Sequence, residues 1–273
     1  MTPVDGTVPP TVDEATAADD GRLAAALADA AGVALQQLRV EFAASGLFDA
    51  KALKDAGDLT AHDLLMAALA KYRPDDAVLS EEGADDFARL DAQRVWIIDP
   101  LDGTREFSEP PRDDWAVHVA LWERGRGSGD AVGELTAGAV ALPGRGQTLS
   151  TDAVEQPTTP IPARPRVLVS RTRPPVEAQR VAAALGADLV PMGSAGAKTM
   201  AVVLGDGDVY VHSGGQYEWD SAAPVAVARA AGMFCSRIDG SSLVYNQRDV
   251  SLPDLIVCRP ELAAAVLAAA VGD

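Results

Sequence analysis

Two aspartates three positions apart follow directly on an apolar run in the stretch VWIIDPLDGTREF, residues 95–107. The run Val95–Ile98 has the composition of a buried strand, so Asp99 and Asp102 place two negative charges at the rim of a core. Unpaired carboxylates in such a place are costly unless a cation or several hydrogen-bond donors hold them. A proline-flanked Asp-Gly is also a common turn sequence, so this stretch alone leaves a structural and a chemical interpretation open.

Further acidic residues occur at comparable places, where strands end or helices begin. Glu81 and Glu82 follow the strand-like AVLS, Asp220 precedes the helical SAAPVAVARAAG, and Asp63 falls in the first turn of a helix expected over residues 60–72. If these groups meet, they form an oxygen-only cation site without His or Cys. Hard Mg²⁺ prefers such ligands, and two aspartates around a turn can bridge two ions roughly 3.5–4 Å apart.

The residues around the two aspartates suit the same chemistry. Pro100 stiffens the loop, and the carbonyl of Leu101 offers one more oxygen ligand. Gly103 allows the backbone to approach a ligand closely. The amides of Gly103 and Thr104 can then donate to an anion, as at the start of a helix. The stretch therefore predicts cations that in turn hold a phosphate.

Several of these residues also have an ordinary structural interpretation, which the sequence leaves open. Thr60 and Asp63 fit a helix capping box, and Asp220 by itself fits an N-cap. Glu82 is expected to be exposed or to lie behind the ligands. His118 occurs in an alternating strand pattern and is expected to pack in the core rather than to catalyse.

Composition narrows the possible partners. The chain has 273 residues, of which 48% are hydrophobic, and a formal net charge of −17, which disfavours nucleic-acid polymers and anionic membranes as partners. No apolar run reaches the roughly 18 residues of a membrane span, and the acidic, proline-rich start is unlike a secretory signal. Cys235, Cys258 and three scattered histidines give no metal-type spacing, so a reduced cytoplasmic compartment is expected.

Two successive patterns predict an α+β lobe followed by an α/β lobe. Apolar residues at helical spacing over 20–38 and 60–72 precede the alternating DWAVHVALWERG and AGAVALP, which flank the turn GRGSGD. This half, residues 19–155, is expected to pack helices on an antiparallel sheet and to carry most metal ligands. Residues 1–18 are expected to form a disordered tail.

The second lobe, residues 166–273, is expected to begin after the connection AVEQPTTPIPARPR. Strands such as VLVS, DLVPM and DVYVH then alternate with helices. Gly186 is expected to cap the C-terminus of one helix, and Ser194 the N-terminus of the next. This lobe would contribute Asp220 and contacts to the substrate.

The acidic motifs resemble, in kind and in order, the inositol monophosphatase superfamily of magnesium-dependent, lithium-sensitive phosphatases. They are Thr60-x-x-Asp63, Glu81-Glu82, DPLDGT and WDSAAP. DPLDGTREF, SRTR, EWDSAAP and the lysine after GSAG look most like the branch of CysQ-type 3′(2′),5′-bisphosphate nucleotidases. The resemblance covers nearly everything beyond the N-terminal tail. It implies a layered αβαβα sandwich of the inositol monophosphatase/fructose bisphosphatase type.

The resemblance also implies roles for matching residues. The metal ligands would be Glu81, Asp99, the Leu101 carbonyl, Asp102, Asp220 and, for a weakly held ion or its water, Asp63. Glu81 and Thr104 would orient and deprotonate the attacking water, with Asp63 assisting catalysis. The substrate contacts would be Gly103, Thr104, Arg105, Ser194, Lys198 and Glu218, although Arg105, Arg171 and Lys198 also fit ordinary surface charges. The chain departs from the branch at Arg173, where histidine is frequent, and at His118, where asparagine is common.

The implied activity is hydrolysis of adenosine 3′,5′-bisphosphate to AMP and phosphate, within sulfur metabolism. Two or three Mg²⁺ ions per site, inhibition by Li⁺ and a homodimer are implied in the same way. A broader phosphatase for inositol 1-phosphate or fructose 1,6-bisphosphate is the alternative within the superfamily. A catalytically silent Mg²⁺- or nucleotide-binding protein is the alternative outside it, and the complete set of acids argues against that alternative.

Overall fold

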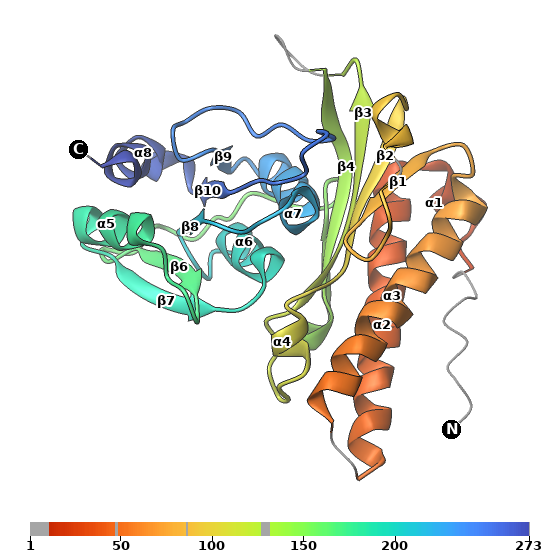
Figure 1. Ribbon diagram of the computed structural model, residues 1–273. Coiled ribbons are helices and arrows are strands. Elements are labelled where there is room, and N and C mark those ends of the chain that lie inside the picture. Colours follow the sequence, from red (N-terminus) through yellow and green to blue (C-terminus); the bar gives the residue numbers. More distant parts are fainter. Residues whose placement is uncertain (1–10, 47–48, 86, 127–131, 273) are drawn as a thin grey trace.

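Two five-stranded sheets alternate with pairs of helices to give a layered αβαβα arrangement (Figure 1). The computed structural model describes residues 11–46, 49–85, 87–126 and 132–272. One sheet and its helices form the first lobe, which ends after residue 150, and the other sheet begins at residue 166 in the second lobe. The layered fold expected from the sequence is therefore confirmed.

The first lobe packs two long helices against a mostly antiparallel sheet. Its helices are α1 (Glu14–Ala18), α2 (Asp20–Ala44), α3 (Ala50–Tyr72) and the short α4 (Thr104–Phe107). Its strands, in spatial order, are β1 (Ala77–Ser80), β2 (Arg94–Asp102), β3 (Ala116–Arg124), β4 (Gly133–Leu142) and β5 (Gln147–Ser150). β1 runs parallel to β2, whereas the remaining neighbours are antiparallel.

The helix expected over residues 60–72 begins ten residues earlier, so the prediction of its start is wrong. Asp49 caps α3 by accepting hydrogen bonds from Lys51 N at 2.9 Å and Ala52 N at 3.1 Å. An aspartate in this place satisfies amides that the helix cannot. Thr60 and Asp63 therefore lie inside the helix and form no capping box.

Part of the N-terminal segment that is expected to be disordered forms a helix. Residues 1–10 lie outside the described residues. Glu14–Ala18, however, form α1, because the carboxylate of Asp13 accepts a hydrogen bond from Thr16 N at 2.7 Å. Val12 N also donates to Tyr72 Oη at 3.2 Å, which ties the segment to the end of α3. The prediction of disorder up to residue 18 is therefore wrong for this part.

Alternation along β3 explains how one strand serves two layers. Val117, Val119 and Leu121 pack into the core shared with α2 and α3, whereas Ala116 and Ala120 pack into the core between the two sheets. Successive side chains of a strand point to opposite faces. His118, between Ala116 and Ala120, therefore points toward the second lobe. Most of the turn expected at GRGSGD lies outside the described residues.

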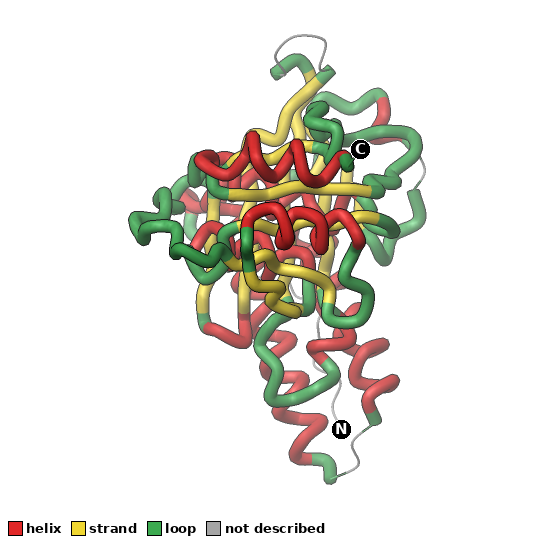
Figure 2. Tube along the Cα trace, turned by 90° about the vertical axis from the view of Figure 1, so that its left-hand side faces the viewer, coloured by secondary structure: helices red, strands yellow, loops and turns green. Residues whose placement is uncertain are grey.

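The second lobe holds a mixed sheet with helices on both faces. Its spatial strand order is β7 (Asp188–Met192), β6 (Arg166–Ser170), β8 (Val209–Ser213), β10 (Asp254–Cys258) and β9 (Phe234–Ser236). Its helices are α5 (Val176–Leu185), α6 (Ala195–Leu204), α7 (Glu218–Ala230) and α8 (Ala263–Val271). Figure 2 views the molecule from the side on which α5 and α8 lie in front of this sheet. Among the described residues, short 3₁₀ turns occur at Ala88–Leu90 and Pro143–Arg145 in the first lobe and at Pro260–Leu262 in the second.

Close packing of α7 on the first sheet brings the second lobe to the end of β2. Gly138 of β4 faces α7, and a Cβ there would lie 2.9 Å from Cβ of Ala226. Because Gly138 has no side chain, helix and sheet can approach closely. Asp220, near the start of α7, is thereby carried to the seam between the lobes.

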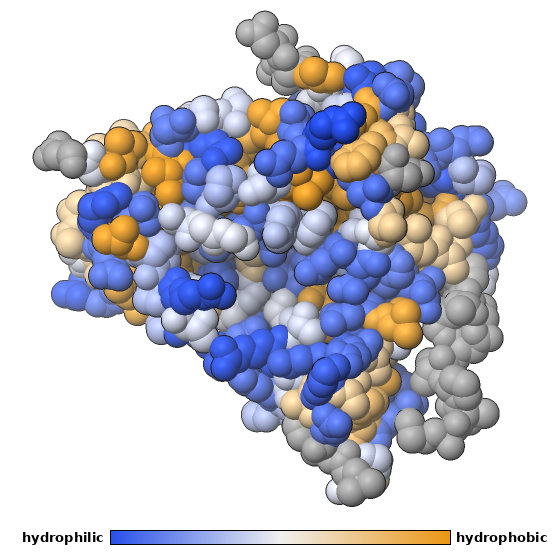
Figure 3. All heavy atoms as spheres, in the orientation of Figure 1, coloured by the Kyte–Doolittle hydropathy of each residue, from blue (hydrophilic) through white to orange (hydrophobic). Residues whose placement is uncertain are grey.

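The face that Figure 3 shows is a mixture of hydrophilic and hydrophobic residues. Exposed apolar side chains are scattered on it, as on most proteins. Within the described ranges, the helices lack the combination of length and hydropathy that crossing a bilayer requires.

We expect Leu65→Ala to lower the free energy of unfolding by about 2–5 kcal/mol, because the side chain is fully buried between α3 and the sheet. Leu59, on the same helix, is 59% exposed, so Leu59→Ala should change the stability by less than about 0.5 kcal/mol. Urea unfolding followed by circular dichroism measures both. Equal effects of the two substitutions would contradict this packing.

Candidate active site

Three aspartates from two lobes converge at the seam. Asp99 and Asp102 lie at the end of β2, and Asp220 is the third residue of α7. Each offers a carboxylate oxygen, and these oxygens lie within 4.8 Å of one another. Asp99 is 1% exposed and Asp102 is 7% exposed. The structure thus brings together three of the expected metal ligands, whose binding of an ion stays a prediction.

Glu81 joins the cluster because β1 and β2 are parallel. Ser80 lies opposite Ile98 in the register, and Glu81 N donates to the Ile98 carbonyl at 3.4 Å. The next residue of each strand, Glu81 and Asp99, therefore emerges at the same edge of the sheet. There the charge of Glu81 adds to the effect of burial in raising the pKa of Asp99.

Asp99 and Asp220 are each anchored by a backbone amide. Asp99 Oδ1 accepts from Leu101 N at 3.0 Å, across the irregular end of β2. Asp220 Oδ2 accepts from Tyr217 N at 2.7 Å, as an acid in the third position of a helix commonly does. In both cases one oxygen fixes the side chain and leaves the other for a ligand.

Asp102 is held most firmly, through its Oδ2. Ser194 Oγ and Gly196 N, at the start of α6, both donate to this oxygen, the amide at 2.6 Å. Ser194 is also the N-cap of α6, as expected, because its Oγ accepts from Ala197 N. His118 approaches the same oxygen, with Nε2 at 3.3 Å.

The pKa values show a cluster that carries more negative charge than its surroundings favour. Burial raises the pKa of Asp99 well above its ordinary value, with repulsion from Glu81 adding to it. Burial and the charge of Asp102 raise the pKa of Asp220 to about 7. Glu81 is an exposed residue, but partial desolvation of its carboxylate and the charge of Asp220 raise its pKa to about 7 as well. Only at Asp102 do the donors outweigh burial, and its pKa falls to about 2. A hard divalent cation would relieve this repulsion, so the donor set fits Mg²⁺.

Gly103 is required where β2 turns into α4. Its φ is +86°, which favours glycine, and a Cβ would lie 3.1 Å from Cβ of Ser194. The next residue, Thr104, donates from Oγ1 to the Leu101 carbonyl at 3.1 Å. The same hydroxyl lies 3.4 Å from Asp58 Oδ1. The pKa of Asp58 is raised to about 6 by burial and by the charge of Glu82.

Asp58, not Asp63, faces the site. Both residues belong to α3, but five positions along a helix correspond to a rotation of about 140°. Asp63 therefore lies on a different side of α3 from the face that meets Thr104. The sequence pattern predicts Asp63 in the site, but the structure brings Asp58 there instead. Gly57 lets this face approach closely, since a Cβ there would lie 2.7 Å from Phe107. With the helix start misplaced, the sequence pattern could not identify Asp58.

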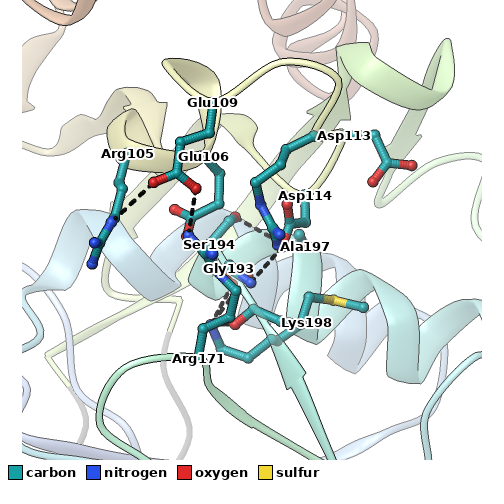
Figure 4. Close-up of polar contacts among 12 residues, drawn as sticks. Arg105, Glu106, Glu109, Asp113, Asp114, Arg171, Gly193, Ser194, Ala197 and Lys198 are labelled. Atoms are coloured by element: carbon teal, nitrogen blue, oxygen red, sulfur yellow. Dashed lines mark hydrogen bonds and ion pairs between the residues drawn. The ribbon is translucent and has the colours of Figure 1, made fainter. Parts of the chain in front are cut away.

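A basic pocket of about 220 Å³ adjoins Ser194, and Figure 4 shows its polar contacts. Its cationic lining residues are Arg105, Arg171, Arg173 and Lys198. Arg171 Nε donates to Glu106 at 2.9 Å, and Arg171 Nη2 donates to Glu109 at 3.0 Å. Arg105 donates to the same Glu109 at 3.2 Å. Two of the arginines are therefore partly neutralised by acids of α4 and the loop after it.

Lys198 was expected to contact the substrate, but its ammonium group is directed at the backbone. It donates to the carbonyls of Gly193 at 3.2 Å and Ser194 at 2.6 Å, and more weakly to Met192 at 3.4 Å. Burial lowers its pKa to about 8. The contacts hold the loop between β7 and α6, which positions Ser194 beside Asp102.

Glu218 was also expected to contact the substrate, and here the structure gives a different role. Its carboxylate is buried and accepts hydrogen bonds from Asn246 N at 2.6 Å and Gln247 N at 2.7 Å. Burial raises its pKa to about 7. Both oxygens are therefore engaged in fixing residues 246–247 against α7. The structure gives Glu218 this role in place of the expected contact with the substrate.

Two acids that no sequence pattern identified, one in a loop and one in α4, join the lobes next to the site. Asp114 Oδ2 accepts from Gly193 N at 2.6 Å and also pairs with Arg112. Glu106 packs on Gly193, where a Cβ would lie 2.2 Å from its Cγ. Neither acid follows an apolar strand directly, so the pattern that identified Asp99 gave no signal for them.

Known proteins resemble the chain over nearly its whole length. A family model described as the inositol monophosphatase family matches residues 20–272. A 3′-phosphoadenosine 5′-phosphate phosphatase from Mycobacterium leprae is 53% identical over 255 residues, which cover 91% of this chain and 92% of that protein. The 3′(2′),5′-bisphosphate nucleotidase CysQ of Escherichia coli is 30% identical over 197 residues, covering 71% and 80%. Among solved structures, CysQ from Bacteroides thetaiotaomicron has a TM-score of 0.71 at 26% identity, covering 87% of this chain and 96% of its own.

We expect Mg²⁺ to stabilise the protein more at pH 8 than at pH 5. Glu81 and Asp220 have pKa values raised to about 7, so the metal-free folded state retains protons that the unfolded chain releases near pH 4. Their stabilising contribution is complete below about pH 4 and is lost as the pH rises through 7. A cation that replaces these protons restores the lost stability.

Differential scanning fluorimetry in EDTA and in Mg²⁺ measures the difference in Tm at each pH. Asp220→Asn serves as the comparison, because removing one titrating acid should reduce the pH dependence. A Mg²⁺-induced increase in Tm that is equal at both pH values in the unsubstituted protein would contradict this electrostatic description.

Proposed function

Because the chain belongs to the inositol monophosphatase family, we propose that it is a Mg²⁺-dependent phosphatase that hydrolyses 3′-phosphoadenosine 5′-phosphate to AMP and phosphate. The observation that carries the proposal is the cluster of Asp99, Asp102 and Asp220, contributed by both lobes. The names of the M. leprae phosphatase and the E. coli nucleotidase support the choice of substrate.

The cation ligands in this proposal are those that the structure brings to one edge of the first sheet. They are Glu81, Asp99, the carbonyl of Leu101, Asp102 and Asp220. Two or three Mg²⁺ ions, when bound, supply Lewis acidity to the water and the phosphate and neutralise developing charge. Asp99 and Asp102 would serve as ligands and not as nucleophiles, because bound cations would occupy the lone pairs that their hydrogen bonds leave free.

Two groups of the chain are placed to accept the proton of the attacking water. Thr104 Oγ1 can hold the water while its hydrogen bond to the Leu101 carbonyl fixes the hydroxyl. Asp58, 3.4 Å from that hydroxyl, has a pKa raised to about 6, and Glu81 has one raised to about 7. A general base works best when its pKa lies near the working pH, because it is then partly ionised and still basic enough to accept a proton. Asp58 thereby takes the catalytic place first expected for Asp63.

The second phosphate of the substrate suits the basic pocket beside Ser194. Arg173 is exposed there, and Arg105 lies at the rim, 59% exposed. Guanidinium groups bind phosphate with paired hydrogen bonds. Lys198 supports the floor of this pocket rather than its opening. The amides of Gly103 and Thr104 remain candidates for contacts to the reacting phosphate.

Further properties implied by the sequence resemblance belong to the same proposal. Li⁺ should inhibit by competing for one of the Mg²⁺ positions. A homodimer, a cytoplasmic location and a place in sulfur metabolism follow from the resemblance alone. They stay proposals.

We expect 3′-phosphoadenosine 5′-phosphate to be hydrolysed with a higher kcat/KM than inositol 1-phosphate or fructose 1,6-bisphosphate. The physical reason is the pocket that can receive a second phosphate next to the acidic cluster. Phosphate release with each substrate, with and without Mg²⁺, provides the comparison. The choice of substrate would be wrong if inositol 1-phosphate were the faster substrate.

Asp58→Asn should lower kcat by about 10²–10⁴-fold, because a proton acceptor is lost. Asp63→Asn makes the same chemical change on the same helix and should alter kcat by less than about threefold, since Asp63 lies on a different side of α3 from the face that meets Thr104. Steady-state kinetics at saturating Mg²⁺ measures both, and circular dichroism confirms folding. The opposite order of the two effects would show that Asp63 and not Asp58 acts in catalysis.

A further inference from the structure

His118, in the middle of β3, lies between the aspartates of β2 and the helix that carries Asp220. Its side chain is fully buried. Nε2 lies 3.3 Å from Asp102 Oδ2, and Nδ1 lies 3.8 Å from Asp99 Oδ2 and 3.1 Å from the carbonyl of Trp219. The ring therefore lies close to Asp99 and Asp102 of the first lobe, and it contacts Trp219, which precedes Asp220 in the second lobe.

The surroundings of the ring are shaped to accept it. Gly196 lies against His118, and a Cβ at that position would lie 2.0 Å from Nε2. The amide of Gly196 donates to the same Asp102 oxygen that Nε2 approaches. The first turn of α6 thus leaves a slot for the ring and meets it at a common carboxylate.

A purely space-filling role does not account for this placement. The neighbouring residues on the same face of β3, Ala116 and Ala120, pack in the apolar core. A buried imidazole costs free energy unless polar groups compensate it, and an apolar side chain would fill the space without that cost. Here the carbonyl of Trp219 accepts from Nδ1, whereas Nε2 is buried without a hydrogen-bond partner and lies 3.3 Å from Asp102 Oδ2. The ring therefore lies between polar groups of the two lobes, with one nitrogen directed at a metal-site carboxylate.

We propose that His118 is a positioning residue of the metal site, which fixes Asp102 relative to the start of α7 and so sets the separation between Asp102 and Asp220. The inference rests on the magnesium site of the proposed function. Contacts behind metal ligands orient them, and their loss typically weakens metal binding by about 10–100-fold. His118 acts through the aspartates and does not itself touch the phosphate.

The test measures binding of Mg²⁺ alone by isothermal titration calorimetry, without substrate. His118→Leu should raise the Kd for Mg²⁺ by about 10–100-fold. The amide nitrogen of Gln can occupy the place of Nε2, whereas that of Asn can occupy only the place of Nδ1. Each amide keeps only one of the two contacts that relate Asp102 to the start of α7, so His118→Gln and His118→Asn should both raise the Kd for Mg²⁺, but by less than His118→Leu does.

Val119→Ala is the matched control. Val119 is the next residue of the strand, is fully buried, and packs on the opposite face against α2 and α3. Its truncation disturbs β3 without touching the acids, so the Kd for Mg²⁺ should not change. A purely structural role of His118 predicts instead that loss of stability and loss of Mg²⁺ affinity run in parallel across the four variants, and that result would overturn the proposal.

A folded His118→Leu protein with an unchanged Kd would also overturn it. If His118→Leu does not fold, Gly196→Ala provides the second variant, because its methyl group would displace Nε2 from Asp102. An unchanged Kd in that variant would contradict the proposal in the same way. If the unsubstituted protein itself binds no Mg²⁺, the proposed function is wrong and the inference about His118 fails with it. If it binds Mg²⁺ and the variants bind it equally well, only the inference is wrong.

Discussion

Repulsion among buried carboxylates is the constraint around which the seam between the lobes is built. Two unit charges about 4 Å apart repel by about 4 kcal/mol at an effective dielectric constant of about 20. The structure places Asp99, Asp102 and Asp220 at comparable separations, and the charge of Glu81 adds to burial in raising the pKa of Asp99. Such an arrangement is stable only if protons or cations neutralise it. The raised pKa values show that protons can neutralise the cluster, whereas the proposed function requires that cations neutralise it.

The contacts that hold the acids also join the lobes. Ser194 and Gly196 of the second lobe donate to Asp102, and the carbonyl of Trp219 meets His118 of β3. Further out, Arg171 pairs with Glu106 across the same seam. The site is therefore complete only when the two sheets are docked through α6 and α7. In the proposed function, metal binding and packing of the lobes would be thermodynamically linked, since an ion that binds only the docked form stabilises it.

Much of the fold and most acids of the candidate site could be predicted from the sequence, because short stretches of residues identify them. An apolar run that ends in an acid identifies a residue at the edge of a sheet, and this signal found Glu81, Asp99 and Asp102. The alternation of strands and helices after residue 166 likewise predicted the second lobe. Asp220 was found because its tryptophan and the small residues after it resemble a known motif.

The remainder depended on information that no local pattern contains. Asp58 lies within a helix whose start was misplaced by ten residues, so its face could not be assigned. Lys198 and Glu218 were expected to contact the substrate because of their motifs, but their partners are backbone groups brought close only by the fold. His118 lies in a correctly predicted strand. Its contacts with Asp102 and Trp219, however, could be identified only from the packing of the second lobe against β3.

The central claim is that acids from both lobes bind cations at one place, and diffraction from crystals soaked in Mn²⁺ tests it most directly. Mn²⁺ prefers the same oxygen ligands as Mg²⁺ and gives an anomalous signal. We expect anomalous peaks between Glu81, Asp99, Asp102 and Asp220, with carboxylate oxygens at about 2.0–2.3 Å. Peaks confined to other acidic surfaces, with this seam empty at saturating Mn²⁺, would contradict the account.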